Sequence, residues 1–291
     1  MELHDRSSQH VIAVASGKGG VGKSTIAVNL AVTLAHTGAA VGLLDADIHG
    51  PNIPRMMGAC GQPQKGPDGT MLPLHNYGVK LMSVGFLAGG TKPVIWRGPL
   101  IGKIIKQFLM QVDWGTLDYL IVDLPPGTGD AQLTLCQSVP LTGGVIVSTP
   151  QDVALEDALR GMEMLRTMQV PILGLIENMS YFLCPHCQTR TDIFDHGGTR
   201  KAAETHHVPF LGELPLDPKI RHGGDAGRPI VVAEPDSVYA EIFRAMCAKL
   251  VANISMEPTA QRAKALIIDQ TCGRARSIVL YPRSFTPQRC Q

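Results

Sequence analysis

The stretch Gly17-Lys-Gly-Gly-Val-Gly22-Lys23-Ser24 decides the fold of this 291-residue chain, because it matches the phosphate-loop pattern G-x-x-x-x-G-K-[ST]. It follows the apolar run Val11–Ser16 directly and precedes the helical pattern of Thr25–His36. A strand, a glycine-rich turn and a helix in this order point successive backbone N–H groups and the helix N-terminus at one anion. The stretch therefore predicts a nucleoside triphosphate site at the start of an α/β domain.

The polar residues of the loop predict how ATP is held. Lys23 is expected to reach the β- and γ-phosphates, and the Ser24 hydroxyl is expected to ligate Mg²⁺. Asp123 follows the apolar run Tyr119–Val122 and matches a carboxylate that holds the magnesium shell. The predicted nucleotide contacts of the loop are Gly17, Gly19, Gly20, Val21, Gly22, Lys23, Ser24 and Thr25.

Short apolar runs alternate with helical patterns along the rest of the chain. The runs are apolar on both faces, as expected for parallel strands that are covered by helices on each side. We predict a doubly wound, mainly parallel α/β sheet with helices on both faces, and ligands at the carboxyl ends of its strands. The predicted strands are Val11–Ser16, Val41–Leu44, Leu81–Phe86, Tyr119–Val122, Gly144–Ser148, Ile172–Ile176 and Phe210–Leu214, and the predicted helices are Thr25–His36, Asp152–Met168 and Asp236–Val251.

The composition excludes several classes of protein. A hydrophobic content of 44% and a charged content of 18% predict a folded domain. An aromatic content of 5% and a net charge of +1 argue against a nucleic-acid-binding surface. The apolar runs fall short of the roughly 18 residues that span a bilayer, so no membrane association is expected. Seven scattered cysteines favour a reducing compartment. We expect the cytoplasm, or the mitochondrial matrix if a transit peptide has been removed.

The character of the chain changes near residue 256. The segment 256–291 holds six Arg or Lys residues against two acidic residues, three prolines and no sustained period. We predict a P-loop ATPase domain over residues 1–255 and a basic C-terminal extension over residues 256–291 that lies outside the core.

The pair Cys184-Pro-His-Cys187 is a second candidate site, because two thiolates on a tight turn can bind one soft metal ion. The residues leave three interpretations open. A redox pair usually opens a helix early in a βαβ unit, whereas this pair comes late in the chain. A zinc site within one chain needs two more ligands, for which His186 and His196 are candidates. A [4Fe–4S] cluster takes four thiolates, which two copies of the chain would supply on a twofold axis.

The motifs together resemble the Mrp/ApbC iron–sulfur carriers, including the mitochondrial Ind-type members. These belong to the ParA/MinD family of P-loop ATPases, which has a deviant Walker A motif. The resemblance runs from about residue 9 to 254 and combines the K-G-G-V-G-K-S loop with C-P-x-C. It also includes D-A-D-I-x-G-P-N-I-P (45–54), V-x-W-R-G-P (94–99), D-x-P-P-G-T-G-D (123–130), S-T-P-Q-D (148–152), E-N-M-S (177–180) and I-F-x-x-G-G (193–198).

The resemblance implies roles for residues of the nucleotide site. The lysine equivalent to Lys18 crosses a dimer interface to the partner's nucleotide, which implies a homodimer closed by ATP. Asp47 would orient the attacking water and Asp45 would support it, so Lys18, Lys23 and Asp47 form the predicted catalytic set. Gly127 and Asp130 lie in a segment that resembles the second switch. The remaining predicted nucleotide contacts are Asn178 at the base and Pro215 and Asp217 beside the adenine.

The resemblance also implies a cargo. Cys184 and Cys187 would hold a labile [4Fe–4S] cluster between two protomers and pass it to apo iron–sulfur proteins. Hydrolysis of ATP would be slow and Mg²⁺-dependent and would serve that transfer. The alternative is a ParA/MinD-like ATPase switch that positions cargo on DNA or membrane. It shares every loop residue, but it would require a basic face or a basic amphipathic terminal helix.

Overall fold

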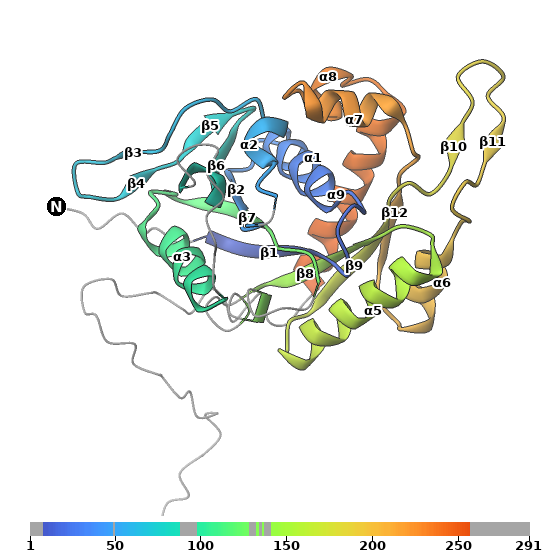
Figure 1. Ribbon diagram of the computed structural model, residues 1–291, viewed down its shortest axis with the longest axis horizontal. Helices are drawn as coiled ribbons and strands as arrows, with labels where there is room; N and C mark the ends of the chain where they lie inside the picture. The colour runs from blue at the N-terminus through green and yellow to red at the C-terminus, as the bar shows by residue number, and fades with distance from the viewer. Residues whose placement is uncertain are drawn as a thin grey trace, which may run out of the picture.

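The computed structural model describes residues 8–48, 50–87, 98–127, 132–133, 136 and 141–256. A central sheet crosses the molecule, and helices cover both of its faces (Figure 1). The strands of this sheet are β1 (Ser8–Ser16), β2 (Val41–Asp45), β5 (Leu74–Asn76), β6 (Val79–Ser83), β7 (Leu117–Asp123), β8 (Gly143–Ser148), β9 (Ile172–Glu177) and β12 (Phe210–Glu213). Two small hairpins, β3–β4 (Gln64–Lys65 and Met71–Leu72) and β10–β11 (Phe182–Leu183 and Arg190–Thr191), lie outside it.

The order of the strands is β12-β9-β8-β1-β7-β2-β6-β5. Neighbouring strands are parallel, except that β5 pairs with β6 in the antiparallel sense. The carboxyl ends of the parallel strands therefore meet at one edge of the sheet. The predicted mainly parallel, doubly wound fold is confirmed, and it brings the ends of β1, β2, β7 and β9 to the edge where ligands bind in such sheets.

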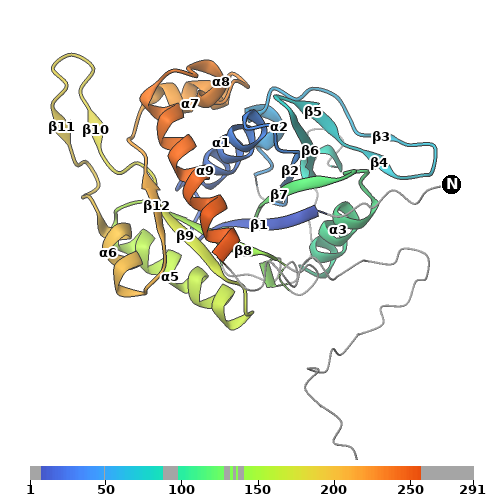
Figure 2. The ribbon, with the colours of Figure 1, turned by 180° about the vertical axis from the view of Figure 1, so that it is seen from behind.

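Two hydrophobic cores explain why the strands are apolar on both faces. Along β1, Ile12 and Val14 are buried in one core, whereas Val11, Ala13 and Ala15 are buried in the other. Seen from behind, the two helix layers lie on opposite sides of β1 (Figure 2). The helices are α1 (Lys23–His36), α2 (Ile53–Met56), α3 (Gly98–Gln111), α5 (Asp152–Thr167), α6 (Gly198–Thr205), α7 (Pro218–Asp225), α8 (Ile230–Ala233) and α9 (Val238–Met256).

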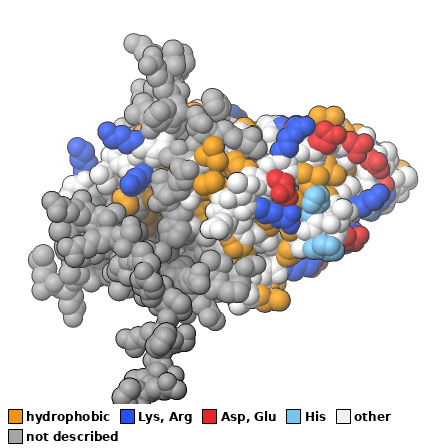
Figure 3. Space-filling view, turned by 90° about the horizontal axis from the view of Figure 1, so that it is seen from below, with side chains coloured by type: hydrophobic (Ala, Val, Ile, Leu, Met, Phe, Trp, Pro, Cys, Tyr) orange, Lys and Arg blue, Asp and Glu red, His pale blue; other side chains and the backbone are white. Residues whose placement is uncertain are grey.

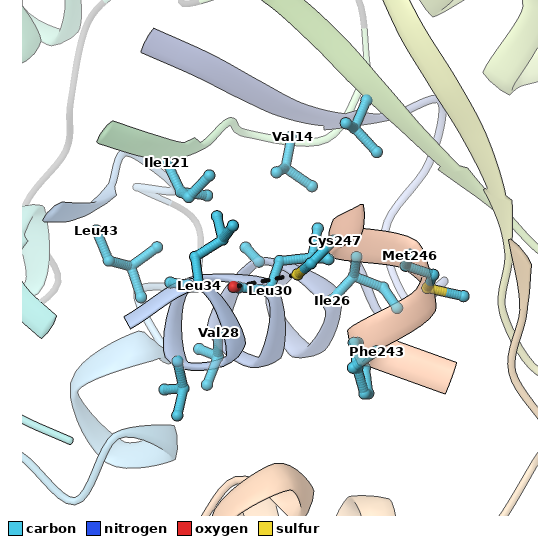
Figure 4. Close-up of a cluster of buried hydrophobic side chains, with 14 of the residues drawn as sticks. Val14, Ile26, Val28, Leu30, Leu34, Leu43, Ile121, Phe243, Met246 and Cys247 are labelled. Atoms are coloured by element: carbon cyan, nitrogen blue, oxygen red, sulfur yellow. Dashed lines mark hydrogen bonds between the residues drawn. The ribbon is translucent and has the colours of Figure 1, made fainter. Parts of the chain in front are cut away.

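Helix α1 lies in the first core and fixes the phosphate loop that precedes it. Figure 4 shows Ile26 and Leu30 of α1 beside Phe243 and Cys247 of α9, under the sheet residue Val14. Each of the large side chains is fully or nearly fully buried, and burying one contributes about 1.5–3 kcal/mol. The start of α1 is thus held rigidly against the sheet.

Most predicted elements are present, with three differences. The predicted strand Leu81–Phe86 begins two residues earlier and ends at Ser83, because Val84–Leu87 form a 3₁₀ turn. The elements that were not predicted are α2, α3, α6, α7, α8, β5 and the β3–β4 and β10–β11 hairpins. Helix α9 continues to Met256, and the rest of the predicted extension, residues 257–291, lies outside the described residues. In the part of the chain that is described, no helix has both the length and the apolar character to cross a membrane.

Candidate functional site

The phosphate loop connects β1 to α1 at the carboxyl edge of the sheet (Figure 1). Gly22 has a φ of 85° and occupies the N-cap of α1, and no side chain caps its N–H groups. No acidic residue stands in the first turn of α1. Free N–H groups at a helix N-terminus form an anion site, so the backbone fits the phosphates of a nucleotide.

Lys23 and Ser24 converge on the carboxylate of Asp123. The Lys23 Nζ atom lies 2.7 Å from Oδ1 of Asp123 and 3.5 Å from Oδ2 of Asp47. The Ser24 hydroxyl donates a hydrogen bond of 2.6 Å to Oδ2 of Asp123. The side chains of Lys23, Asp47 and Asp123 are 6%, 12% and 0% exposed, respectively. The sequence predicted these residues for one site, and the structure brings them together.

The electrostatics of the site are dominated by burial. Burial raises the pKa of Asp123, and the ammonium group of Lys23 opposes that shift. Burial, together with the nearby Asp123 carboxylate, raises the pKa of Asp45 to about 8. Burial therefore favours the protonated form of Asp45, while the Lys23 ammonium group lies beside the carboxyl groups of Asp123 and Asp47.

Asp45 holds the backbone of Asp47 in place through a hydrogen bond. Its Oδ1 atom accepts a hydrogen bond of 3.1 Å from the backbone N–H of Asp47, and its Oδ2 atom accepts one of 2.8 Å from the Ser83 hydroxyl. Gly85 N–H donates to the same Ser83 oxygen at 3.0 Å. Ser83, at the end of β6, was missed by sequence reasoning. The predicted strand Leu81–Phe86 ran three residues past Ser83, so the sequence did not place this residue at a strand end.

Asn178 touches the phosphate loop directly. Its side-chain amide donates a hydrogen bond of 2.8 Å to the carbonyl oxygen of Val21. A Cβ atom at Gly22 would lie 2.1 Å from the Asn178 Nδ2 atom, so the loop needs glycine at this point. Asn178 follows β9 and thus contacts the phosphate loop through its side chain.

Lys18 lies on the same edge of the sheet. Its Nζ atom is 3.5 Å from Oε1 of Gln151, which precedes α5. Gly127 donates from its backbone N–H to the carbonyl of Ser16 at 3.0 Å, so the segment after β7 is joined to the end of β1. Asp130, predicted for the second switch, lies outside the described residues, as do Trp96 and Arg97.

The residues predicted to flank the adenine have structural partners. Pro215 is buried after β12. Asp217 is the N-cap of α7: its Oδ1 atom accepts a hydrogen bond of 2.7 Å from the Lys219 N–H, and its Oδ2 atom accepts one from the Tyr239 hydroxyl. The Asp217 carboxylate therefore caps a helix, and its predicted contact with a nucleotide stays a prediction.

The two cysteines lie in the turn between β10 and β11, a hairpin that projects from the body of the molecule (Figures 1 and 2). The Cys184 N–H donates to the Thr189 carbonyl at 3.0 Å, and the Gln188 N–H donates to the Cys184 carbonyl at 2.8 Å. Cys187 is exposed and Cys184 is partly buried. Hydrogen bonding to Thr189 and to Cys184 lowers the pKa of Cys187. Two accessible thiols on a tight turn fit one edge of a thiolate-bound metal site.

The surroundings of the pair separate the interpretations left open by the sequence. The pair lies in a hairpin turn, whereas a thioredoxin-like pair opens a helix. Among the described residues, the one group of three His, Cys, Asp or Glu side chains spaced to hold a metal is Glu177, His196 and Glu213, which contains neither cysteine. The described part of one chain thus offers no third such ligand beside the two thiols.

The comparisons with known proteins agree with this geometry. Residues 7–251 match a family model described as ParA: NUBPL iron-transfer P-loop NTPase. An iron–sulfur cluster carrier protein of Synechocystis sp. is 56% identical over 263 residues, which cover 87% of this chain and 74% of that protein. The iron–sulfur cluster transfer protein NUBPL of Mus musculus is 51% identical over 252 residues, which cover 86% of this chain and 79% of that protein.

A solved structure also resembles the whole described body. It is a nucleotide-binding protein from Archaeoglobus fulgidus in complex with ADP and with cobalt present. The TM-score is 0.70 and the sequence identity is 40%, with 81% of this chain and 92% of that chain covered.

Proposed function

Since this chain belongs to the NUBPL iron-transfer P-loop NTPase family, it is an iron–sulfur cluster carrier with a nucleotide-hydrolysing fold, and we propose that it binds a [4Fe–4S] cluster between two copies and releases it under the control of ATP. The hydrogen bond from Asn178 to the phosphate loop carries this proposal. Asn178 stands six residues before Cys184, so the nucleotide site and the thiol hairpin share one short segment.

ATP binding would exchange the partners of Lys23. Its ammonium group lies 2.7 Å from the Asp123 carboxyl group and 3.5 Å from that of Asp47. Phosphate oxygens bound by the N–H groups at the start of α1 would attract that ammonium group. Asp123 would then be available to the Mg²⁺ shell and Asp47 to the attacking water. Mg²⁺, held by Ser24 with Asp123 in its outer shell, would supply charge neutralisation of the phosphates.

Hydrolysis is assigned to Asp47, with Asp45 as its support. Asp47 would accept a hydrogen bond from the attacking water and so orient it. The hydrogen bond from the Asp47 backbone N–H to Asp45 fixes where that carboxylate stands. We propose slow turnover, because the loop motif Gly17–Ser24 itself contains no arginine.

Lys18 is assigned to the nucleotide of a second copy. Its present contact with Gln151 is at the 3.5 Å limit of a hydrogen bond, so little holds the ammonium group in its own chain. The cysteine hairpin follows β9, whose carboxyl end lies at the same edge of the sheet as the loop that contains Lys18. Two copies joined at this edge would bring four thiols together, which is the number that a [4Fe–4S] cluster takes.

The described surface gives the DNA-positioning alternative less support. On the right-hand part of the face seen in Figure 3, acidic and basic side chains are interspersed. Helix α5 pairs Arg160 with Asp157 and Arg166 with Glu163. A nucleic-acid-binding face would be predominantly basic. The recipients of the cluster are accordingly proposed to be apo iron–sulfur proteins.

Anaerobic reconstitution with iron and sulfide tests the cargo. The wild type should gain a broad absorbance near roughly 400 nm and about four irons per dimer. Cys184→Ala and Cys187→Ala should each lose both. Cys60→Ala is the matched control, because Cys60 is also an exposed free thiol but lies far along the chain from the hairpin, and it should reconstitute like the wild type.

Two results would contradict the proposal. Stoichiometric zinc per monomer without a chromophore would indicate a structural metal. A chromophore that survives in both hairpin variants would place the cluster elsewhere in the chain.

A further inference from the structure

Glu177, the last residue of β9, is a fully buried carboxylate that only neutral donors contact among its described hydrogen bonds. Its Oε1 atom accepts from the Ser180 hydroxyl at 2.6 Å and from the Gly197 N–H at 2.9 Å. Its Oε2 atom accepts from the Thr199 N–H at 2.8 Å. Burying a carboxylate is costly unless such bonds offset the lost hydration, so this residue is held firmly.

These bonds join the two ends of one segment of the chain, here called its outgoing leg and its returning leg. The segment 178–197 leaves the sheet after β9, forms the β10–β11 hairpin and returns at the start of α6 (Figure 1). Ser180 belongs to the outgoing leg, and Gly197 and Thr199 belong to the returning leg. One carboxylate therefore closes the base of the segment that carries both cysteines.

The same residue adjoins the nucleotide site. Asn178, its neighbour in sequence, donates to Val21 of the phosphate loop through its side chain and to Ser148 of β8 through its backbone. The Ser180 N–H donates to the Leu214 carbonyl after β12 at 2.8 Å. A displacement of Asn178 by a bound nucleotide would thus act on Glu177 first and on the hairpin through it.

A metal site at this position fits less well. Oxygen and nitrogen atoms of Glu177, His196 and Glu213 lie within 4.8 Å of one another. Both lone-pair directions of the Glu177 Oε1 atom are already used, and Arg200 lies 3.2 Å from the Glu213 carboxylate. A guanidinium group beside the carboxylate would repel a bound cation. The bonds of Glu177 instead describe a clamp between backbone segments.

We propose that Glu177 is the positioning residue that transmits nucleotide occupancy to the cysteine hairpin. This inference rests on the proposed function, since it assigns the coupling between its two sites to one side chain. The Glu177→Gln side chain keeps the shape but presents an NH₂ group to one of its donors. It therefore loses at least one bond of the clamp, while Asn178 and both cysteines keep their own groups.

The first readout needs no metal. Alkylation of Cys187 by iodoacetamide is measured on the metal-free chain with and without saturating ADP. In the wild type the two rates should differ by about fivefold or more, the lower end of typical coupling between sites. In Glu177→Gln the ratio should fall to near one, while the ADP dissociation constant stays within about twofold of wild type.

Glu163→Gln is the matched control, because it removes an exposed carboxylate of α5 that contacts Arg166 and lies outside the segment closed by Glu177. It should keep the wild-type ratio. Ser180→Ala removes a single bond from the outgoing leg and should give an intermediate ratio, which keeps the test valid if Glu177→Gln folds poorly. The second readout is the rate at which a chelator removes iron from the reconstituted protein, with the same expected order of nucleotide dependence.

The outcomes separate this inference from the function on which it rests. If the wild type binds no cluster at all, the proposed function fails. If it binds a cluster and responds to ADP, but Glu177→Gln responds equally, the assignment to Glu177 is overturned. A wild-type alkylation ratio near one also overturns it, because there would be no signal to transmit.

Discussion

Thr189 is a close partner of Cys187 in the turn of the hairpin. Its sulfur lies 3.2 Å from the Thr189 hydroxyl, and this hydrogen bond is the largest cause that lowers the pKa of the thiol. The carbonyl of the same threonine accepts from the Cys184 N–H. Thr189 therefore contacts both halves of the cysteine pair, although it belongs to no motif that the sequence made visible.

Removing that hydroxyl should change the pH at which Cys187 reacts. Thr189→Val keeps the shape but cannot donate to a thiolate, so the pKa of Cys187 should rise. A lowered pKa means more thiolate at a given pH, so the alkylation rate of metal-free Thr189→Val should reach its half-maximum at a higher pH than wild type. Thr189→Ser should stay close to wild type. Equal midpoints in all three proteins would show that the hydroxyl has no such effect.

At the scale of single residues, the sequence predicted which residues form the site better than it predicted their pKa values and hydrogen-bond partners. The loop motif was sufficient to select Lys23 and Ser24, and the apolar run before Asp123 selected that carboxylate, because phosphate and magnesium chemistry requires such groups. It could not predict that Asp45 has a pKa of about 8, since that value comes from burial and from a carboxylate on another strand. It likewise could not predict that the Tyr239 hydroxyl donates to Asp217, because the two residues are 22 positions apart in the sequence.

At the scale of elements, helix α5 packs closely against the phosphate loop. A Cβ atom at Gly17 would lie 2.0 Å from the carbonyl carbon of Asp157 and 2.3 Å from the nitrogen of Ala158, both in the α5 backbone. A Cβ atom at Gly19 would meet nothing within 4 Å. The structure thus leaves no space for a side chain at Gly17 but leaves open space at Gly19.

We expect Gly17→Ala to destabilise the nucleotide-free protein by about 1–3 kcal/mol, the usual cost of overpacking, because backbone atoms of α5 cannot move aside cheaply. Gly19→Ala should change the free energy of unfolding by no more than about 0.5 kcal/mol. Urea unfolding of both variants in the absence of nucleotide measures the difference. Similar losses in the two variants would mean that α5 does not pack tightly on the loop.

Elements were predictable where their pattern was strong. Central strands that are apolar on both faces were predicted to within a few residues, since burial on both sides leaves a continuous apolar run. Helices α6 and α7 were missed because they are short and polar, and α7 contains two glycines that lower helix propensity. These helices form where contacts from other segments hold them, as Glu177 does for the start of α6.

The assembly of two copies is the prediction that belongs to the whole molecule. With Mg²⁺ and a non-hydrolysable ATP analogue, the wild type should elute from size-exclusion chromatography as a dimer. Lys18→Ala should bind the analogue but remain a monomer and should lose ATP hydrolysis, because the charge that reaches the partner's phosphates is gone. Lys201→Ala, which changes an exposed lysine on α6, is the control and should behave like the wild type. A wild type that remains a monomer would remove the basis for a cluster shared between copies.

The closing of the hairpin segment at one point has a consequence for how such a protein can diversify. A loop whose two ends are pinned together can be lengthened, shortened or replaced without moving the strands beside it. Metal preference and recipient choice can then change by exchange of some twenty contiguous residues, while the ATP machinery keeps its geometry. Grafting the corresponding segment from one relative into another should therefore carry the cargo specificity of the donor with it.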